Sequence, residues 1–307
     1  MTTRAKMVAT FELCVEVLFK FYARAEDLDA FYITLCAVHA VLSFTAIMGN
    51  VTMIFALQKA SSIPTTSRIL MQSLALTDLS VGVLGHPLYI VVISAIRKSY
   101  SCENIHVILM AFFTLSASLV VVSFQIVAFI GVDRFLAITL HLRYNELVTP
   151  KRVVLMIASV WIATLSVLLI GVLYYFQVGE IVILVGGYVS VIFLGFIYTK
   201  VYFVASRHQA SINSQAQATS NLNLARNKNL AIKTLYVFFV FELCVLPYLV
   251  TLTVLLISGT SVVLQGAVQS ASALMMLNSS LNPIVFGWKM KEIRQIVKNK
   301  VKAIFHC

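Results

Sequence analysis

The chain has 307 residues, of which 60% are hydrophobic and only 11% are charged, and its mean hydropathy is +0.93. A soluble domain carries about a quarter charged residues, so this composition excludes a sizeable soluble domain and predicts a protein that lies mostly inside a bilayer. The net charge of +11 does not require a nucleic-acid partner, because Lys and Arg residues that flank membrane spans on one side give the same excess.

Seven apolar runs follow one another along the chain, each long enough for a helix that crosses a hydrocarbon core of about 30 Å. The connectors are short, except for Gln209–Asn229, which is rich in Ser, Asn, Gln and Ala and which we expect to be a flexible loop. The predicted fold class is therefore an all-α membrane protein, a bundle of seven transmembrane helices. The runs are Phe31–Leu57, Ile69–Ile96, Ile105–Leu136, Val153–Tyr174, Ile181–Val204, Ala231–Ile257 and Val262–Trp288.

The segments outside the spans are residues 1–30 and 289–307. The first has basic residues before an apolar stretch, as a secretory signal does, but Glu12 and Glu16 interrupt that stretch, and we predict an uncleaved N-terminal segment. The second places apolar residues at helical spacing opposite six Lys and Arg residues, which predicts an amphipathic helix that lies on the membrane surface against lipid. Residues 31–288 form the predicted transmembrane domain.

The basic residues predict the orientation of the chain. Of the 23 Lys and Arg residues, 17 lie on the side of the membrane that holds the C-terminal segment and six on the side that holds the N-terminus. Because Lys and Arg concentrate on the cytoplasmic side, we predict a multi-pass plasma-membrane protein with an extracellular N-terminus and a cytoplasmic C-terminus.

Polar residues inside apolar spans are costly and mark functional sites, and here they fall into short motifs. With Trp161 and Tyr198 in the fourth and fifth spans, these motifs resemble the signatures of rhodopsin-class (class A) G-protein-coupled receptors over residues 33 to 300, with Phe135 and Phe286 in positions where the family has Tyr. The motifs are Gly49-Asn50-Val51, Leu74-Ala75-Leu76-Thr77-Asp78, Asp133-Arg134-Phe135, Phe241-x-x-Cys244-x-x-Pro247 and Asn282-Pro283-Ile284-Val285-Phe286.

The resemblance implies a polar cluster in the middle of the membrane that holds Na⁺ and water in the inactive state. A carboxylate surrounded by neutral oxygens suits a hard cation, and a water-filled hydrogen-bond network without an ion is the alternative. No other cofactor is expected. The residues of this cluster are Asp78, Ser123, Asn278, Ser279 and Asn282.

The resemblance also implies a switch that couples the receptor to a heterotrimeric G protein, in which Arg134 leaves Asp133 and faces the partner when the sixth helix moves. No acidic residue stands at the inner end of the sixth span, so the cytoplasmic salt bridge of some family members is missing and raised basal activity is expected. We also expect prolines in the second, sixth and seventh spans to kink their helices. The predicted switch residues are Asp133, Arg134, Phe135, Tyr198, Pro247, Pro283 and Phe286, and the third proline is Pro87.

Several departures from the family restrict its branch. No Cys lies between Trp161 and Tyr198, and the connector there is about five residues (Phe176–Glu180), so the usual disulfide cannot form; a Cys14–Cys102 pair is the alternative. The fifth span lacks the usual Pro, and the segment from His141 to Thr149 resembles the second inner loop of adenosine and melanocortin receptors. These features favour a grouping with adenosine, melanocortin, cannabinoid and lysophospholipid receptors.

The predicted ligand pocket is mostly apolar, which suits a lipid-like or small apolar ligand. Ser116 stands where amine receptors have Asp, Met276 where opsins have the retinal Lys, and Leu252 where adenosine receptors have the Asn that holds adenine. Helix packing is the alternative role for any one of these residues. The predicted pocket is His86, Tyr89, Phe112, Phe113, Ser116, Val120, Tyr248, Leu252 and Met276.

The predicted function is a cell-surface receptor that converts the binding of an extracellular ligand into activation of a heterotrimeric G protein. A transporter is the alternative, since Asp78 and Glu242 could form an ion path, although no inverted repeat supports it. No nucleophile–base pair or metal-ligand set supports an enzyme. For Glu242, ion pairing, protonation and a water cavity all remain open.

Overall fold

The computed structural model describes residue 22 and residues 25–98, 102–140, 143–174, 176–212 and 220–305. The described part contains helices and short connectors, without a β-strand. The predicted pairing of Cys14 with Cys102 and the question of a signal sequence concern side chains outside the described part. The elements are α2 (Ala25–Lys59), α3 (Thr65–Ser80), η1 (Val81–Gly85), α4 (His86–Arg97), α5 (Cys102–Thr139), α6 (Tyr144–Leu147), α7 (Pro150–Tyr174), α8 (Phe176–Ile212), α9 (Ser220–Ser258), α10 (Val262–Lys289) and α11 (Lys291–Phe305).

Six helical segments of the described part are both long and apolar enough to cross a membrane, and they coincide with the first six predicted spans. The helix α10 has 28 residues, which at 1.5 Å per residue also suffices for about 30 Å of hydrocarbon. It is less apolar because it carries several amide and hydroxyl side chains. These side chains lie on the buried face of α10, where other helices shield them from lipid: Gln265, Gln269, Asn278, Ser279, Ser280 and Asn282.

The second span is one continuous rod made of α3, η1 and α4, and η1 is a π-helical segment. Pro87 lies in the first turn of α4. A proline ring has no N–H and collides with the carbonyl group four residues earlier, and a π segment is one way to widen the backbone at that point. In the sixth and seventh spans, α9 and α10 continue helically through Pro247 and Pro283.

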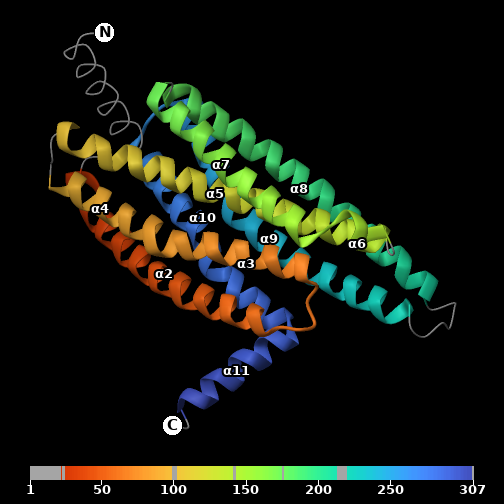
Figure 1. Ribbon diagram of the computed structural model, residues 1–307. Coiled ribbons are helices and arrows are strands. Elements are labelled where there is room, and N and C mark those ends of the chain that lie inside the picture. The colour runs from red at the N-terminus through yellow and green to blue at the C-terminus, as the bar shows by residue number, and fades with distance from the viewer. Residues whose placement is uncertain are drawn as a thin grey trace.

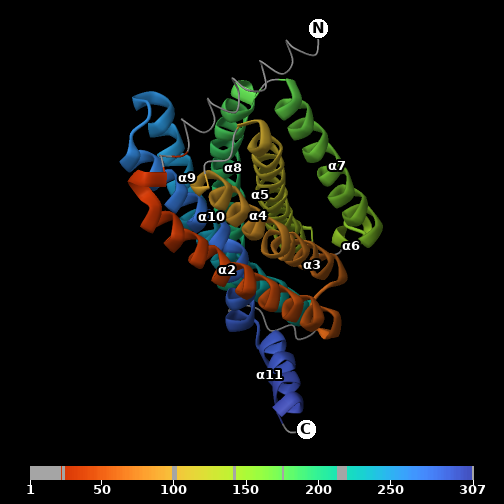
Figure 2. The same cartoon turned by 90° about the vertical axis from the view of Figure 1, so that its left-hand side faces the viewer.

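The long helices lie side by side, and α11 leaves the bundle where α2 ends (Figures 1 and 2). We call this the α11 end of the bundle. Ala25, at the start of α2, lies at the opposite end, as expected for a chain with an odd number of spans. Large apolar side chains cover the outside of the bundle; for example, Ile192 is 71% and Leu155 is 70% exposed. Such a surface is stable in lipid and not in water.

The helix α11 is anchored to the connector between α2 and α3 through Glu292. One oxygen of this carboxylate accepts hydrogen bonds from the backbone N–H groups of Ser61 and Ser62 at 2.8 and 3.1 Å, and the Ser62 hydroxyl donates to the other. Partial burial alone would raise the pKa of Glu292, but these hydrogen bonds outweigh burial and hold the pKa below its ordinary value. The anchor fixes the direction in which α11 leaves the bundle.

Two predicted connectors are wrong in their extent. Phe176–Glu180 forms the first turn of α8 rather than a loop. The segment Gln209–Asn229 is helical at both ends, because α8 runs to Ile212 and α9 begins at Ser220. This segment contains no Gly or Pro, so its residues can extend helices that the membrane has already nucleated.

Candidate functional site

The polar cluster predicted in the middle of the membrane lies between α2, α3, α5 and α10. Asp78 is fully buried, and one of its carboxylate oxygens accepts a 2.7 Å hydrogen bond from Nδ2 of Asn282. Asn50 donates from Nδ2 to the backbone carbonyls of Ala46 and Ser279, at 2.8 and 2.9 Å. The polar motifs of the first, second and seventh spans therefore meet in one place.

Four buried oxygens of this cluster have no hydrogen-bond partner in the described part of the chain. They are Oδ1 of Asp78, Asn50, Asn278 and Asn282. All four are acceptors, and buried acceptors without donors are costly. A cation with oxygen ligands, or waters that donate to these oxygens, would satisfy them. These oxygens are therefore suitable ligands for Na⁺, which would be held by the Asp78 carboxylate together with neutral amide oxygens.

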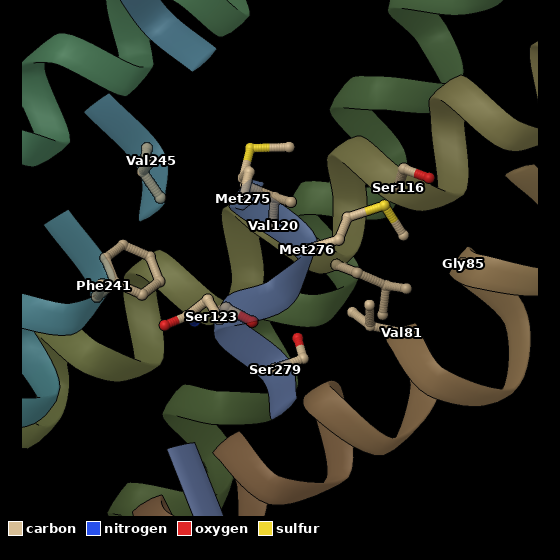
Figure 3. A pocket seen from close by; sticks show the side chains of 12 residues that line it. Val81, Gly85, Ser116, Val120, Ser123, Phe241, Val245, Met275, Met276 and Ser279 are labelled. Carbon is tan, nitrogen blue, oxygen red and sulfur yellow. The ribbon is translucent and has the colours of Figure 1, made fainter. Parts of the chain in front are cut away.

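A small cavity connects this cluster with part of the predicted ligand pocket (Figure 3). Its volume of about 20 Å³ is sufficient for one water molecule or a single ion. Among its lining residues are Ser123, Asn278 and Ser279 from the predicted ion cluster and Ser116, Val120 and Met276 from the predicted pocket. Sequence analysis did not assign the other lining residues to a pocket: Val81, Gly85, Leu119, Phe241, Val245 and Met275.

The rest of the predicted ligand pocket lies nearer the end of the bundle that is opposite to α11. Tyr89, Phe112 and Leu252 belong to one buried apolar cluster, and Phe113 and Tyr248 pack against it. The rings of Tyr89 and Phe112 meet edge to face with centroids 5.7 Å apart. We call this set the aromatic cluster.

A polar group adjoins the aromatic cluster. His86 and His39 face each other with their Nδ1 atoms 2.9 Å apart, and the His39 ring stacks on Tyr89 at 3.8 Å. The Tyr89 hydroxyl donates to Oε1 of Gln269 at 3.1 Å. Sequence analysis missed His39, Gln269 and the buried Tyr22, although the first two are polar residues inside apolar spans, which is the signal that could have identified them.

At the α11 end, the residues of the predicted switch include a network of hydrogen bonds around Asp133 and Arg134. Arg134 is completely buried and donates from Nε to the Asp133 carboxylate at 3.1 Å, and its Nη2 reaches both that carboxylate and the Ser67 hydroxyl. Ser67 in turn donates to Asp133 at 2.9 Å. The Tyr144 hydroxyl donates to the other Asp133 oxygen and contacts Thr66. Arg134 is thus held inside the bundle.

Tyr144 lies on α6, outside the membrane spans, and burial together with the neighbouring Asp133 carboxylate raises the pKa of its phenol. The hydroxyl therefore stays protonated and available as a donor. In the sequence analysis, Tyr144 was only part of the segment from His141 to Thr149, and Ser67 and Thr66 were not identified, because their role depends on the approach of α3 to α5.

The remaining switch residues pack at separate places. The Tyr198 hydroxyl donates to the Val127 carbonyl at 3.1 Å, and its ring stacks on Phe238 of α9. Phe135 packs beside Ile138 and Val201, and Phe286 lies in the main core. Pro283 of α10 approaches Gly49 of α2 so closely that a Cβ atom on this glycine would lie 3.1 Å from the proline ring.

A cation–π contact joins α9 to α10 at the α11 end. The Lys289 ammonium lies 3.4 Å from the centre of the Tyr236 ring and 3.6 Å from that of Trp288. Tyr236 belongs to α9, whereas Lys289 and Trp288 end α10. This contact stabilises the packing of α9 against α10 at that end. In the described part of the chain, no acidic residue of α9 pairs with Arg134 of α5.

Comparison with known proteins agrees with this architecture. The family described as 7 transmembrane receptor (rhodopsin family) matches residues 49–180 and 175–286. Adenosine receptor A3 of Ovis aries is 26% identical over 305 residues, which cover 90% of this chain and 92% of that protein. The histamine H2 receptor of Rattus norvegicus is 24% identical over 92% of this chain and 82% of that protein. Adenosine receptor A2a of Homo sapiens is 24% identical over 89% of this chain and 72% of that protein.

These matches confirm the predicted seven-helix membrane fold and the predicted receptor class, and they do not favour the transporter alternative. Adenosine receptors are among the relatives, in agreement with that part of the predicted grouping. The chain belongs to the rhodopsin family of seven-transmembrane receptors and is a multi-pass cell-surface receptor that acts through a heterotrimeric G protein.

Proposed function

We propose that this receptor responds to a small, largely apolar extracellular ligand that binds between the aromatic cluster and the cavity beside Ser116. The observation that carries this proposal is the continuity of the nine predicted pocket residues. Six of them form or adjoin the aromatic cluster, and the other three line the cavity. Phe112 and Ser116 lie one helical turn apart on α5, so a ligand between them would contact both parts.

The side chains of this pocket argue against the ligands for which the relatives are named. Leu252 is 2% exposed and offers no hydrogen bond to a nucleobase, and Ser116 has no charge to balance an ammonium group. A site that lacks the matching polar groups loses several kcal/mol of selectivity for a polar ligand. We therefore propose that neither adenosine nor histamine is the natural agonist.

We propose that the N-terminus is extracellular and that the α11 end faces the cytoplasm, because most of the basic residues lie at that end. Basic residues on α11 would then face the anionic lipid of the inner leaflet. The G protein would bind at this end, where release of Arg134 from Asp133 would expose guanidinium donors to backbone carbonyls of the partner.

We propose that Na⁺ binds at Asp78 when the receptor is inactive. The four unpartnered acceptors support this proposal, and the small cavity lined by Ser123, Asn278 and Ser279 of the same cluster has room for an ion or a water. An ion that prefers one arrangement of α3 and α10 would stabilise that arrangement in proportion to its differential affinity. A network of waters would satisfy the same acceptors without any dependence on Na⁺.

The ligand proposal is tested with a compound library on cells that express the receptor, with nucleotide exchange on a panel of G proteins as the readout. We expect apolar agonists, and we expect Leu252→Asn to weaken them by at least tenfold because it buries an unpaired amide in their site. Leu243→Asn, at a lipid-facing position of the same helix that is 68% exposed, controls for the substitution itself. Activation by adenosine or histamine would refute the proposal.

A further inference from the structure

Glu242 is a buried carboxylate that the proposed function does not use. It lies on α9 within the membrane-spanning segment Thr234–Ser258 and is only 8% exposed. Neither of its carboxylate oxygens has a hydrogen-bond partner in the described part of the chain. Because a polar group inside a membrane is costly unless it is satisfied, an unpartnered carboxylate at this place points to a partner from outside the chain.

The side of α9 that carries Glu242 faces α8. Phe238, one helical turn before Glu242, stacks on Tyr198 of α8 at 4.7 Å. Thr253, three turns after Glu242, shares a 3.0 Å hydrogen bond with the Tyr188 hydroxyl of α8. Residues spaced by one or three helical turns lie on one face, so Glu242 lies on the face of α9 that packs against α8.

Gly195 is the residue of α8 at the level of Glu242. The two helices are antiparallel. Phe238 stacks on Tyr198 and Leu249 lies against Gly187, and both pairs give the same register, which places Gly195 opposite residue 241, beside Glu242. A Cβ atom on Gly195 would meet no atom within 4 Å, so the space beside this glycine is open.

The open space beside Gly195 borders the lipid. Ile192 and Phe196, on either side of this glycine in α8, are 71% and 58% exposed, and Leu243 of α9 is 68% exposed. We call this open space beside Gly195, on the lipid-facing side of the contact between α8 and α9, the notch. Glu242 lies eight residues from the Thr234 end of the span, which corresponds to a depth of about 12 Å.

We propose that this notch binds a lipid-soluble primary amine, whose nitrogen contacts the Glu242 carboxylate and whose aliphatic chain lies along the exposed apolar side chains of α8 and α9. Two unpartnered oxygens need more than one donor. A primary ammonium supplies three N–H donors and a balancing charge, whereas a hydroxyl supplies one donor and no charge. The occupant would bridge two helices, at a place separate from the aromatic cluster.

The experiment uses the purified full-length receptor in nanodiscs of zwitterionic lipid, with the melting temperature followed as decylamine is added. Decan-1-ol has one donor and no charge, and decyltrimethylammonium has the charge without an N–H donor, so the three probes separate charge from hydrogen bonding. At tenfold above its Kd, decylamine should raise the Tm of the wild type by about 2–4 °C relative to the two other probes.

Two variants and one matched control locate the site. Glu242→Gln removes the charge, and Gly195→Val fills the notch without a clash, because the space beside Gly195 is open; each should weaken decylamine binding at least tenfold. Gly186→Val is the control, since Gly186 lies on the same helix and also has open space beside it; this variant should bind like the wild type.

The proposal would be overturned by no decylamine shift in the wild type, by an equal shift in Glu242→Gln, or by an equal shift with decan-1-ol or decyltrimethylammonium. An equal shift in Gly195→Val would place the amine elsewhere and would overturn it as well. None of these measurements requires the receptor's agonist or a G protein, so their failure is distinguishable from failure of the proposed ligand pocket.

Discussion

Replacing Asp133 with Asn should raise the basal activity of the receptor. The side chain keeps its size, but the buried Arg134 guanidinium loses the only carboxylate that the described part of the chain places beside it. Ser67 and Tyr144 donate to different oxygens of Asp133, and an amide has only one acceptor oxygen, so one of these two bonds would be lost and the other would be weaker. The substitution therefore destabilises the conformation that keeps Arg134 inside the bundle more than it destabilises one in which Arg134 reaches solvent or a partner.

The magnitude follows from the burial of this pair. Removing one partner of a buried ion pair costs about 3–5 kcal/mol, and every 1.4 kcal/mol is a tenfold change in an equilibrium. If the whole cost fell on the inactive conformation, the ratio of active to inactive receptor would rise by roughly a hundredfold to a few thousandfold. A receptor with about one active molecule in a hundred would then become mostly active, so basal exchange should approach the agonist-stimulated maximum.

The assay is binding of a non-hydrolysable GTP analogue to the G protein in membranes with matched amounts of surface receptor. Asp29→Asn is the matched control, because it also removes a carboxylate from an ion pair, here with Arg97 at 2.5 Å, but both side chains are partly exposed. Exposed pairs contribute about 0–1 kcal/mol, so this control should behave like the wild type. Unchanged basal exchange in Asp133→Asn would refute the reasoning.

Three further predictions concern the ion, the α9–α10 contact and the orientation. Asp78→Asn should abolish any effect of Na⁺ on ligand affinity, because a neutral amide cannot balance the cation; an unaltered Na⁺ titration would leave the water network as the explanation. Lys289→Gln should free Tyr236 and raise basal exchange about two- to fivefold, the equivalent of roughly 0.5–1 kcal/mol. Lys200→Gln, whose lysine faces Phe196 of the same helix, should leave basal exchange unchanged, and equal effects of the two variants would contradict a role for the Lys289–Tyr236 contact. An N-terminal tag should be labelled on intact cells and a C-terminal tag only after permeabilisation; the reverse pattern would overturn the orientation.

The membrane fold was predictable because each span is a local property of the sequence. About 20 consecutive apolar residues suffice to specify a membrane helix, and six of the seven runs coincide with the spans of the structure. The run that becomes α10 is the least apolar, because it carries several side chains of the polar cluster around Asp78. These side chains, Asn278, Asn282 and their neighbours, could be recognised in the sequence. The ends of α8 and α9 were missed because helix extension beyond the membrane has no hydropathy signal.

The site was predictable where a motif, or a position counted from one, placed its residues. Asp78 and Asn282 belong to motifs on different spans, and the structure brings them to 2.7 Å. By contrast, His39 and Gln269 belong to no motif, and their part beside Tyr89 depends on how α2, α4 and α10 approach one another. Ser67 was missed for the same reason: a single serine near a span end has no distinguishing pattern until α5 is packed beside it.

The central claim is that Arg134 is held inside the bundle at rest and engages the G protein in the active receptor. The most direct test compares nucleotide exchange on purified heterotrimeric G proteins by the wild type and by Arg134→Ala, at equal receptor concentration and across all G-protein families. We expect the wild type to accelerate exchange on at least one family and Arg134→Ala to lose this acceleration while it still folds and reaches the cell surface. Exchange by Arg134→Ala that equals that of an active wild type would contradict the claim.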